Sequence, residues 1–158
     1  MSDDRPKVVY DCNIFIQSII NLGGPAGRCI DKVRTRQVTL IVSAFVLAEI
    51  QESHRKIPAK YGVSEQQTAA LAKAVTAVAN LVDDIPATFA YPRDPDDAHY
   101  VNLALAAQAN LIVSRDRDLL DLMDVTRGEA VNFRRQFPRL RILDPVQFLR
   151  EIDAARRS

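Results

Sequence analysis

Four acidic residues stand where their side chains can act together, and they are Asp11, Glu49, Asp97 and Asp116. Asp11 and Asp116 follow short β-prone runs at residues 8–10 and 111–113. The carboxyl ends of parallel strands open onto one crevice, so these two side chains are expected to face each other. Clustered carboxylates repel and raise one another's pKa, whereas a Mg²⁺ or Mn²⁺ ion turns such a cluster into an oxygen-rich site.

Glu49 and Asp97 are singled out by their positions on predicted helices. Glu49 is the one charged residue between Val38 and Ile50, and it lies beside an apolar stripe. A lone carboxylate there loses free energy on desolvation unless a partner such as a cation compensates it. Asp97 lies in the first turn of its helix and precedes apolar residues on the same face, so it is expected to point inward.

A metal site of this kind predicts hydrolysis of phosphodiesters. One or two divalent ions lower the pKa of a bound water, orient the hydroxide for in-line attack and stabilise the leaving oxygen. This chemistry requires no His, Ser or Cys nucleophile. His54 and His99 lie on different predicted helices without ligand spacing, and both are expected to be surface residues.

Several of these acids also have a simpler structural interpretation. Asp11 follows a strand and would serve there as a helix cap, although Asn13 is the better cap. Asp94 is expected to cap its helix and Asp96 to face solvent, but the third carboxylate remains open among Asp94, Asp96 and Asp97. Asp118 is equally a fifth carboxylate or the cap of a turn.

The elements that must position these residues alternate along the chain. Strands are expected at residues 8–10, 38–42, 111–113 and 140–143, and helices at residues 12–20, 25–33, 44–57, 65–82, 95–107 and from 145 onward. Ser64 and Gln67 have the spacing of a capping box, and Asp94-Pro95 is a well-formed helix start. This order favours a parallel sheet covered by helices on both faces.

Composition limits the class of protein. The chain has 158 residues, 47% of them hydrophobic and 26% charged, which is the profile of one folded domain spanning residues 1–158. The 21 basic residues balance 20 acidic ones, so the overall charge does not indicate a protein that binds nucleic acid. The two cysteines lack metal-ligand spacing, and neither a signal peptide nor a membrane span is recognisable, so we expect a cytoplasmic protein with reduced thiols.

Four motifs together resemble those of a known family. They are Val8-Val9-Tyr10-Asp11-Cys12-Asn13, Ser43 with Glu49, Asp94-Pro95-Asp96-Asp97, and Ile112-Val113-Ser114-Arg115-Asp116-Arg117-Asp118-Leu119-Leu120. Their order and spacing are similar to those of PIN domains, above all the bacterial subfamily of VapC-like toxin components of toxin–antitoxin systems. Each motif alone is weak, but the combination is specific. The resemblance covers roughly residues 7–121 and leaves a strand and helix at about 139–157 as a C-terminal addition.

The resemblance implies a three-layer α/β/α sandwich around a central parallel sheet, dependence on Mg²⁺ or Mn²⁺, and endonucleolytic cleavage of RNA. The positions that match the family's acids are Asp11, Glu49, Asp97 and Asp116. Asn13 and Ser114 match supporting positions, from which they would hydrogen-bond the carboxylates or a metal-bound water. Cys12 and Ser114 stand where threonine is commoner, and neither change removes a metal-binding oxygen. A cognate antitoxin and a homodimer are also implied by the resemblance alone.

Other functions fit the sequence less well. A receiver-type signalling module needs a lysine near its phosphorylated aspartate, and no lysine follows Lys73. A haloacid-dehalogenase-type phosphohydrolase expects Asp-x-Asp after the first strand, where this chain has Asp11-Cys12-Asn13. A catalytically inactive PIN-like RNA- or protein-binding module would lack at least one acid. The sequence therefore predicts a metal-dependent endoribonuclease, with the inactive binding module as the alternative.

Overall fold

A five-stranded sheet forms the centre of the computed structural model, which describes residues 4–157. The strands, in the spatial order β3-β2-β1-β4-β5, are β1 (Lys7–Tyr10), β2 (Thr39–Val42), β3 (Asn80–Leu81), β4 (Leu111–Val113) and β5 (Arg141–Leu143). All neighbouring pairs are parallel. The register aligns Val8 of β1 with Leu40 on one side and Leu111 on the other.

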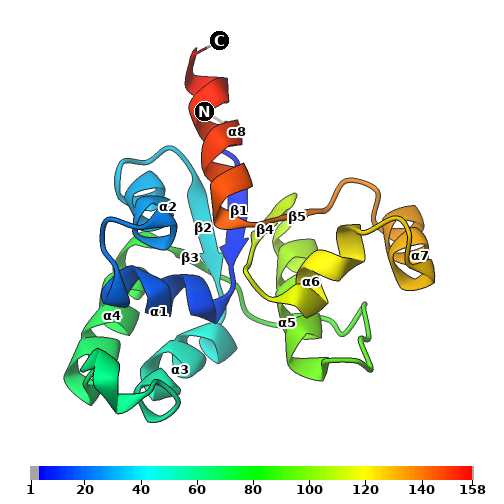
Figure 1. The fold of residues 1–158 in the computed structure, drawn as a ribbon. Coiled ribbons are helices and arrows are strands. Elements are labelled where there is room, and N and C mark those ends of the chain that lie inside the picture. The colour runs from blue at the N-terminus through cyan, green and yellow to red at the C-terminus, as the bar shows by residue number, and fades with distance from the viewer. Residues whose placement is uncertain (1–3, 158) are drawn as a thin grey trace.

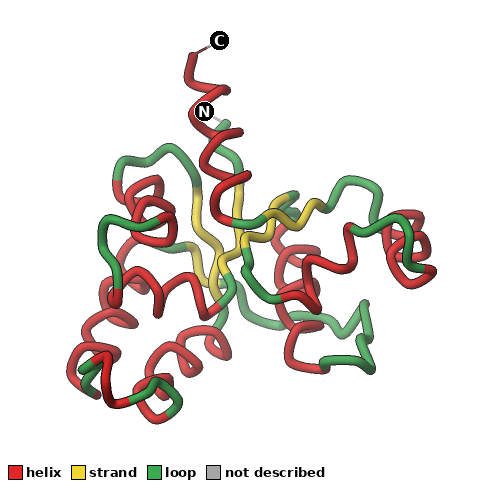
Figure 2. The backbone as a smooth tube through the Cα atoms, viewed as in Figure 1, coloured by secondary structure: helices red, strands yellow, loops and turns green. Residues whose placement is uncertain are grey.

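Helices cover both faces of this sheet. On one side in Figure 1 lie α1 (Cys12–Ile20), α2 (Pro25–Arg34), α3 (Ala44–Glu52) and α4 (Glu65–Val78). On the other lie α5 (Pro95–Ala107), α6 (Arg117–Leu120) and α7 (Gly128–Gln136), while α8 (Pro145–Arg157) contacts α2. Figure 2 shows the strands enclosed between the two helical layers. The predicted three-layer α/β/α sandwich is confirmed.

The central strands are apolar on both faces because helices cover both faces. Val8, Val9, Leu40 and Ile41 are all at most 2% exposed, and such continuous burial suits a parallel sheet. The chain leaves β1 toward β2 and later crosses back to β4 on the other side of β1. A binding crevice forms at this kind of switch point, outside the carboxyl ends of β1 and β4.

The C-terminal elements share the core of the sheet. Phe148 of α8 is fully buried, and its ring centroid lies 5.8 Å from that of Tyr10 in β1. The Tyr10 hydroxyl donates a hydrogen bond to the Cys29 carbonyl oxygen of α2 at 2.8 Å. The helix that follows β5 is therefore held against the strand that leads to Asp11.

Two predicted helix boundaries were wrong, and several elements were not expected. The helix expected at residues 44–57 ends at Glu52 and continues as single 3-10 turns, η1 (Ser53–Arg55) and η2 (Ala59–Tyr61). The helix expected to reach residue 82 ends at Val78, and β3 follows it. Neither α7 nor the 3-10 turn η3 (Asp121–Met123) was expected. Within residues 4–157, no helix is long and apolar enough to cross a membrane, and both cysteines are free.

Candidate active site

Ser114 joins the two acids that follow neighbouring strands. Its hydroxyl donates a hydrogen bond to Asp11 Oδ2 at 2.6 Å and accepts one from the Asp116 backbone N–H at 2.9 Å. The serine is fully buried, so its position is set by the sheet rather than by solvent. Asp11 at the end of β1 and Asp116 beyond β4 are thus fixed relative to each other, as their positions after parallel strands indicated.

Asp97 belongs to a tight group of carboxylates. One oxygen from each member lies within 4.8 Å of the others, and the members are Asp94, Asp97, Asp116 and Asp118. Asp97 is only 5% exposed, and its Oδ2 has no hydrogen-bond partner among the described residues. Burial, followed by the negative charges of Asp116 and Asp94, raises the pKa of Asp97 from 3.8 to about 8. A divalent cation with oxygen ligands would compensate such a side chain, so the residues fit a Mg²⁺ or Mn²⁺ ion.

Glu49 lies across the crevice and is held by Tyr100. The buried Tyr100 hydroxyl donates to Glu49 Oε1 at 2.5 Å and accepts from the Cys12 backbone N–H at 3.1 Å. Burial raises the pKa of the half-buried Glu49 carboxyl, and Asp11 adds to the effect, whereas the Tyr100 hydrogen bond opposes it. Tyr100 is one of the residues that follow Asp97 on the same helix face, and the helix pattern gave no sign of its contact with Glu49.

A cleft of about 520 Å³ opens over the site and is lined at its inner end by Asp11, Glu49 and Asp116. The four predicted acids are thus divided between two overlapping groups. Asp116 belongs to both the cleft lining and the tight group, Asp97 belongs to the tight group, and Asp11 and Glu49 border the cleft. Asp94 and Asp118 complete the tight group.

The three acids of the Asp94–Asp97 segment have different surroundings. Asp94 accepts a hydrogen bond from the Asp96 backbone N–H at 3.2 Å, which confirms its predicted role as the cap of α5. Asp96 is exposed, as expected, and Asp97 is buried. Asp94 nevertheless contributes an oxygen to the tight group, so capping does not remove it from the site.

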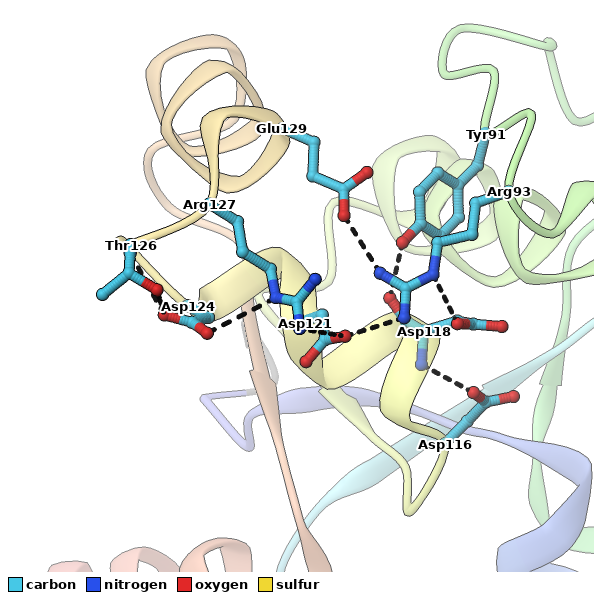
Figure 3. Close-up of polar contacts among 9 residues, drawn as sticks. All are labelled: Tyr91, Arg93, Asp116, Asp118, Asp121, Asp124, Thr126, Arg127 and Glu129. Atoms are coloured by element: carbon cyan, nitrogen blue, oxygen red, sulfur yellow. Dashed lines mark hydrogen bonds and ion pairs between the residues drawn. The ribbon is translucent and has the colours of Figure 1, made fainter.

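Arg93 connects this group to the elements beyond it, as Figure 3 shows. Its Nε lies 2.6 Å from Asp118 Oδ1, Nη2 lies 2.7 Å from Asp121 Oδ2, and Nη1 lies 3.0 Å from Glu129 Oε1. The guanidinium fork suits several carboxylates at once and offsets their negative charge. Arg93 was not predicted as part of the site, whereas Arg115 and Arg117 of the fourth motif, which flank Asp116 in the sequence, are both exposed. Its place directly before the Asp94-Pro95 helix start was the available signal.

Two expectations about neighbouring residues were wrong. Asp11, not Asn13, caps α1, and its Oδ1 accepts the Asn13 backbone N–H at 3.3 Å. The exposed Asn13 side chain makes no hydrogen bond within residues 4–157, although it lines the cleft. His54 and His99 are both half-buried rather than on the surface. His54 Nδ1 lies 2.9 Å from the Gln51 carbonyl oxygen, whereas His99 Nε2 lies 2.7 Å from the Ser43 hydroxyl and its ring lies against Phe45.

Comparisons with known proteins identify a relative along nearly the whole chain and a shared fold. The chain is 28% identical over 155 residues to the uncharacterized protein MJ1680 of Methanocaldococcus jannaschii, and the match covers 97% of this chain and 96% of that protein. A crystal structure of VapBC2 from Rickettsia felis, bound to a DNA fragment from its promoter, contains a chain with the same fold. That match has a TM-score of 0.54 and 17% identity, and covers 87% of this chain and 98% of that one. The family model described as PIN domain matches residues 7–118, and the chain belongs to this family.

Proposed function

We propose that the protein is a Mg²⁺- or Mn²⁺-dependent endoribonuclease that acts in the cytoplasm, with Asp11, Glu49, Asp97 and Asp116 as its metal-binding acids. The observation that carries the proposal is Asp97, a buried carboxylate in a tight group of acids, whose Oδ2 has no hydrogen-bond partner among the described residues. An arrangement that serves only stability would pair or neutralise such a group. Membership of the PIN-domain family adds support.

The residues that would hold a metal are Asp97 and Asp116, with Asp94 and Asp118 beside them and Asp11 and Glu49 on the cleft side. When bound, the metal would supply an activated water and stabilise the charge that develops on a phosphodiester. Ser114 fixes Asp11 against Asp116, and Tyr100 holds Glu49 through Oε1. These contacts leave Glu49 Oε2 without a hydrogen bond among the described residues, so it can accept a proton or bind a ligand.

The physiological role that we propose is that of a toxin with a cognate antitoxin. The support is the fold shared with a chain of the VapBC2 complex, together with the motif resemblance. Residues 1–158 would form a single PIN-like domain that can pair as a homodimer. Asn13, Ser114 and Asp118 would support the four acids.

Cleavage of end-labelled single-stranded RNA tests the activity. Wild-type protein, Asp97→Asn and the exposed control Asp84→Asn, which lies outside the cleft lining and the tight group, would each be incubated with Mn²⁺, Mg²⁺ or EDTA. We expect wild type and Asp84→Asn to cleave, EDTA to abolish cleavage, and Asp97→Asn to lose at least about 100-fold, since even outer partners of metal ligands cost up to this much. Equal cleavage by all three proteins would expose a contaminant or a wrong assignment. RNA binding without cleavage would support the inactive binding module instead.

A further inference from the structure

The cleft extends well beyond the acidic residues. Its outer part lies between α1 and the segment that contains η1 and η2, and its lining there includes Ile16, Ile20, Lys56, Ile57, Pro58 and Tyr61. The acids therefore occupy only the inner end of a larger recess. The outer walls combine apolar side chains with one cation and one aromatic ring, and this combination suits a nucleotide, which has an anionic backbone and a flat base.

Lys56 is placed to attract an anion. Its ammonium group makes no ion pair with the described residues, unlike the neighbouring Arg55, which contacts Glu52 at 2.9 Å. Lys56 nevertheless lies close enough to act electrostatically on Glu49 and Cys12 at the inner end of the cleft. An unpaired cation that borders both the acids and the apolar wall can hold a backbone phosphate next to the one that reacts.

Tyr61 offers a surface for a base. The side chain is 48% exposed although it lines the cleft, and Lys60 Nζ lies over one face of its ring, 5.1 Å from the centroid, so a base would stack on the opposite face. The chain turns directly after it through Gly62, whose φ of 64° lies in the left-handed region that glycine adopts most easily. Stacking on an aromatic ring is available to every base, but only when the base is not enclosed in a duplex.

We propose that the outer cleft binds one nucleotide of single-stranded RNA beside the scissile phosphate, with Lys56 contacting a backbone phosphate and Tyr61 stacking on the base. This inference rests on the proposed function, because it takes RNA as the substrate of the same site. Ile16 and Ile57 line the recess around the stacked base. A protein segment is the competing occupant, but it would not require an unpaired lysine next to the acids.

Fluorescence anisotropy with a labelled single-stranded RNA oligonucleotide tests the subsite. All variants would be made in the Asp97→Asn background and measured with EDTA, so that RNA is not cleaved. We expect Tyr61→Ala to weaken binding at least about fivefold and Tyr61→Phe to retain it, because phenylalanine still stacks. Lys56→Ala should weaken binding and make the negative slope of log K against log salt shallower by about 0.7, because one phosphate contact is lost. Tyr61→Ala should leave that slope unchanged.

The matched control is Lys73→Ala, which removes an equal charge from an exposed position of α4 outside the cleft lining. It should keep the affinity and salt slope of the background protein. The subsite is overturned when Lys56→Ala and Tyr61→Ala bind like the control, when a duplex of the same sequence binds equally well, or when no oligonucleotide binds. The proposal is also overturned, in favour of a protein occupant, when Lys56→Ala or Tyr61→Ala loses affinity for an apolar peptide but keeps its affinity for RNA.

The two proposals fail in different ways. If wild-type protein cleaves RNA with Mn²⁺ while both cleft variants retain normal affinity, the ribonuclease activity stands and the subsite falls. If the cleft variants lose affinity as expected but wild-type protein cleaves nothing with either metal, the subsite stands and the ribonuclease activity falls.

Discussion

Asp97→Asn is expected to stabilise the fold when no divalent metal is present, although it removes the carboxylate on which the proposed activity most depends. The pKa of Asp97 is about 8 in the folded protein against an ordinary value of 3.8. Because the folded-state pKa is the higher one, the folded state binds this proton more tightly. The contribution of that proton to stability is complete below pH 3.8 and is lost as pH rises through about 8. Asparagine is uncharged throughout, so its advantage over aspartate grows across this interval.

The size of the effect at pH 7 follows from how far this pH lies above the ordinary pKa of 3.8, because pH 7 is still below the folded-state pKa of about 8. At pH 7, roughly three pH units above the ordinary value, each unit is worth about 1.4 kcal/mol, so the upper bound is roughly 4 kcal/mol. Asp94, Asp116 and Asp118 are only half-buried, and relaxation and solvent around them reduce the penalty. We therefore expect Asp97→Asn to gain about 2 kcal/mol at pH 7, or roughly 4–8 °C in Tm for a protein of this size.

Thermal unfolding followed by circular dichroism at pH 5, 7 and 8 in EDTA measures this gain, with the exposed Asp96→Asn as the control for charge and helix-terminus effects. The order should reverse with Mn²⁺. Wild type should gain about 2.7 kcal/mol at a hundred times its Kd for the ion, and Asp97→Asn much less. A variant less stable than wild type at every pH, or equal stabilisation of both proteins by Mn²⁺, would refute the assignment of Asp97 as a buried metal ligand.

Two further predictions concern residues outside the four acids. Arg93→Ala should lower the apparent Mn²⁺ affinity in a cleavage titration by about 10–100-fold, because Asp118 loses the guanidinium that orients it. Arg93→Lys should recover part of this loss, and the exposed Arg117→Ala should have the Mn²⁺ affinity of wild type. A normal Mn²⁺ affinity in Arg93→Ala would show that Arg93 does not support the metal site. Phe148→Ala should cost about 3–5 kcal/mol in urea unfolding while keeping a single transition, because its buried ring packs on Tyr10. An early separate transition would show that the C-terminal helix is not part of a single domain.

Local signals in the sequence predicted most of the elements well. The capping box of Ser64 and Gln67 forms as expected, and Asp94 caps the helix that begins at Pro95. The buried strands were recognisable because they are runs of branched apolar residues enclosed on both faces. Each of these features depends on residues that are close in sequence, so a short window of sequence contains the whole cause.

Features that depend on distant partners were not predictable in this way. Strand β3 has two exposed residues, Asn80 and Leu81, and forms only because β2 supplies the hydrogen-bonding edge. Arg93 and Tyr100 likewise acquire their roles from contacts with residues far along the chain, Asp118 and Glu49 respectively. Nothing in the immediate sequence around either residue identifies that partner.

Two of the acids cap a helix and also belong to the tight group, so a structural role does not exclude a chemical one. Asp94 and Asp116 each accept a backbone N–H through Oδ1, and both still contribute an oxygen to the tight group. A carboxylate has two oxygens, so the cap uses one and fixes the direction of the other. An acid that caps a helix can therefore still present its second oxygen to a neighbouring group or a ligand. A capping signal in the sequence does not by itself argue against a proposed metal-binding role.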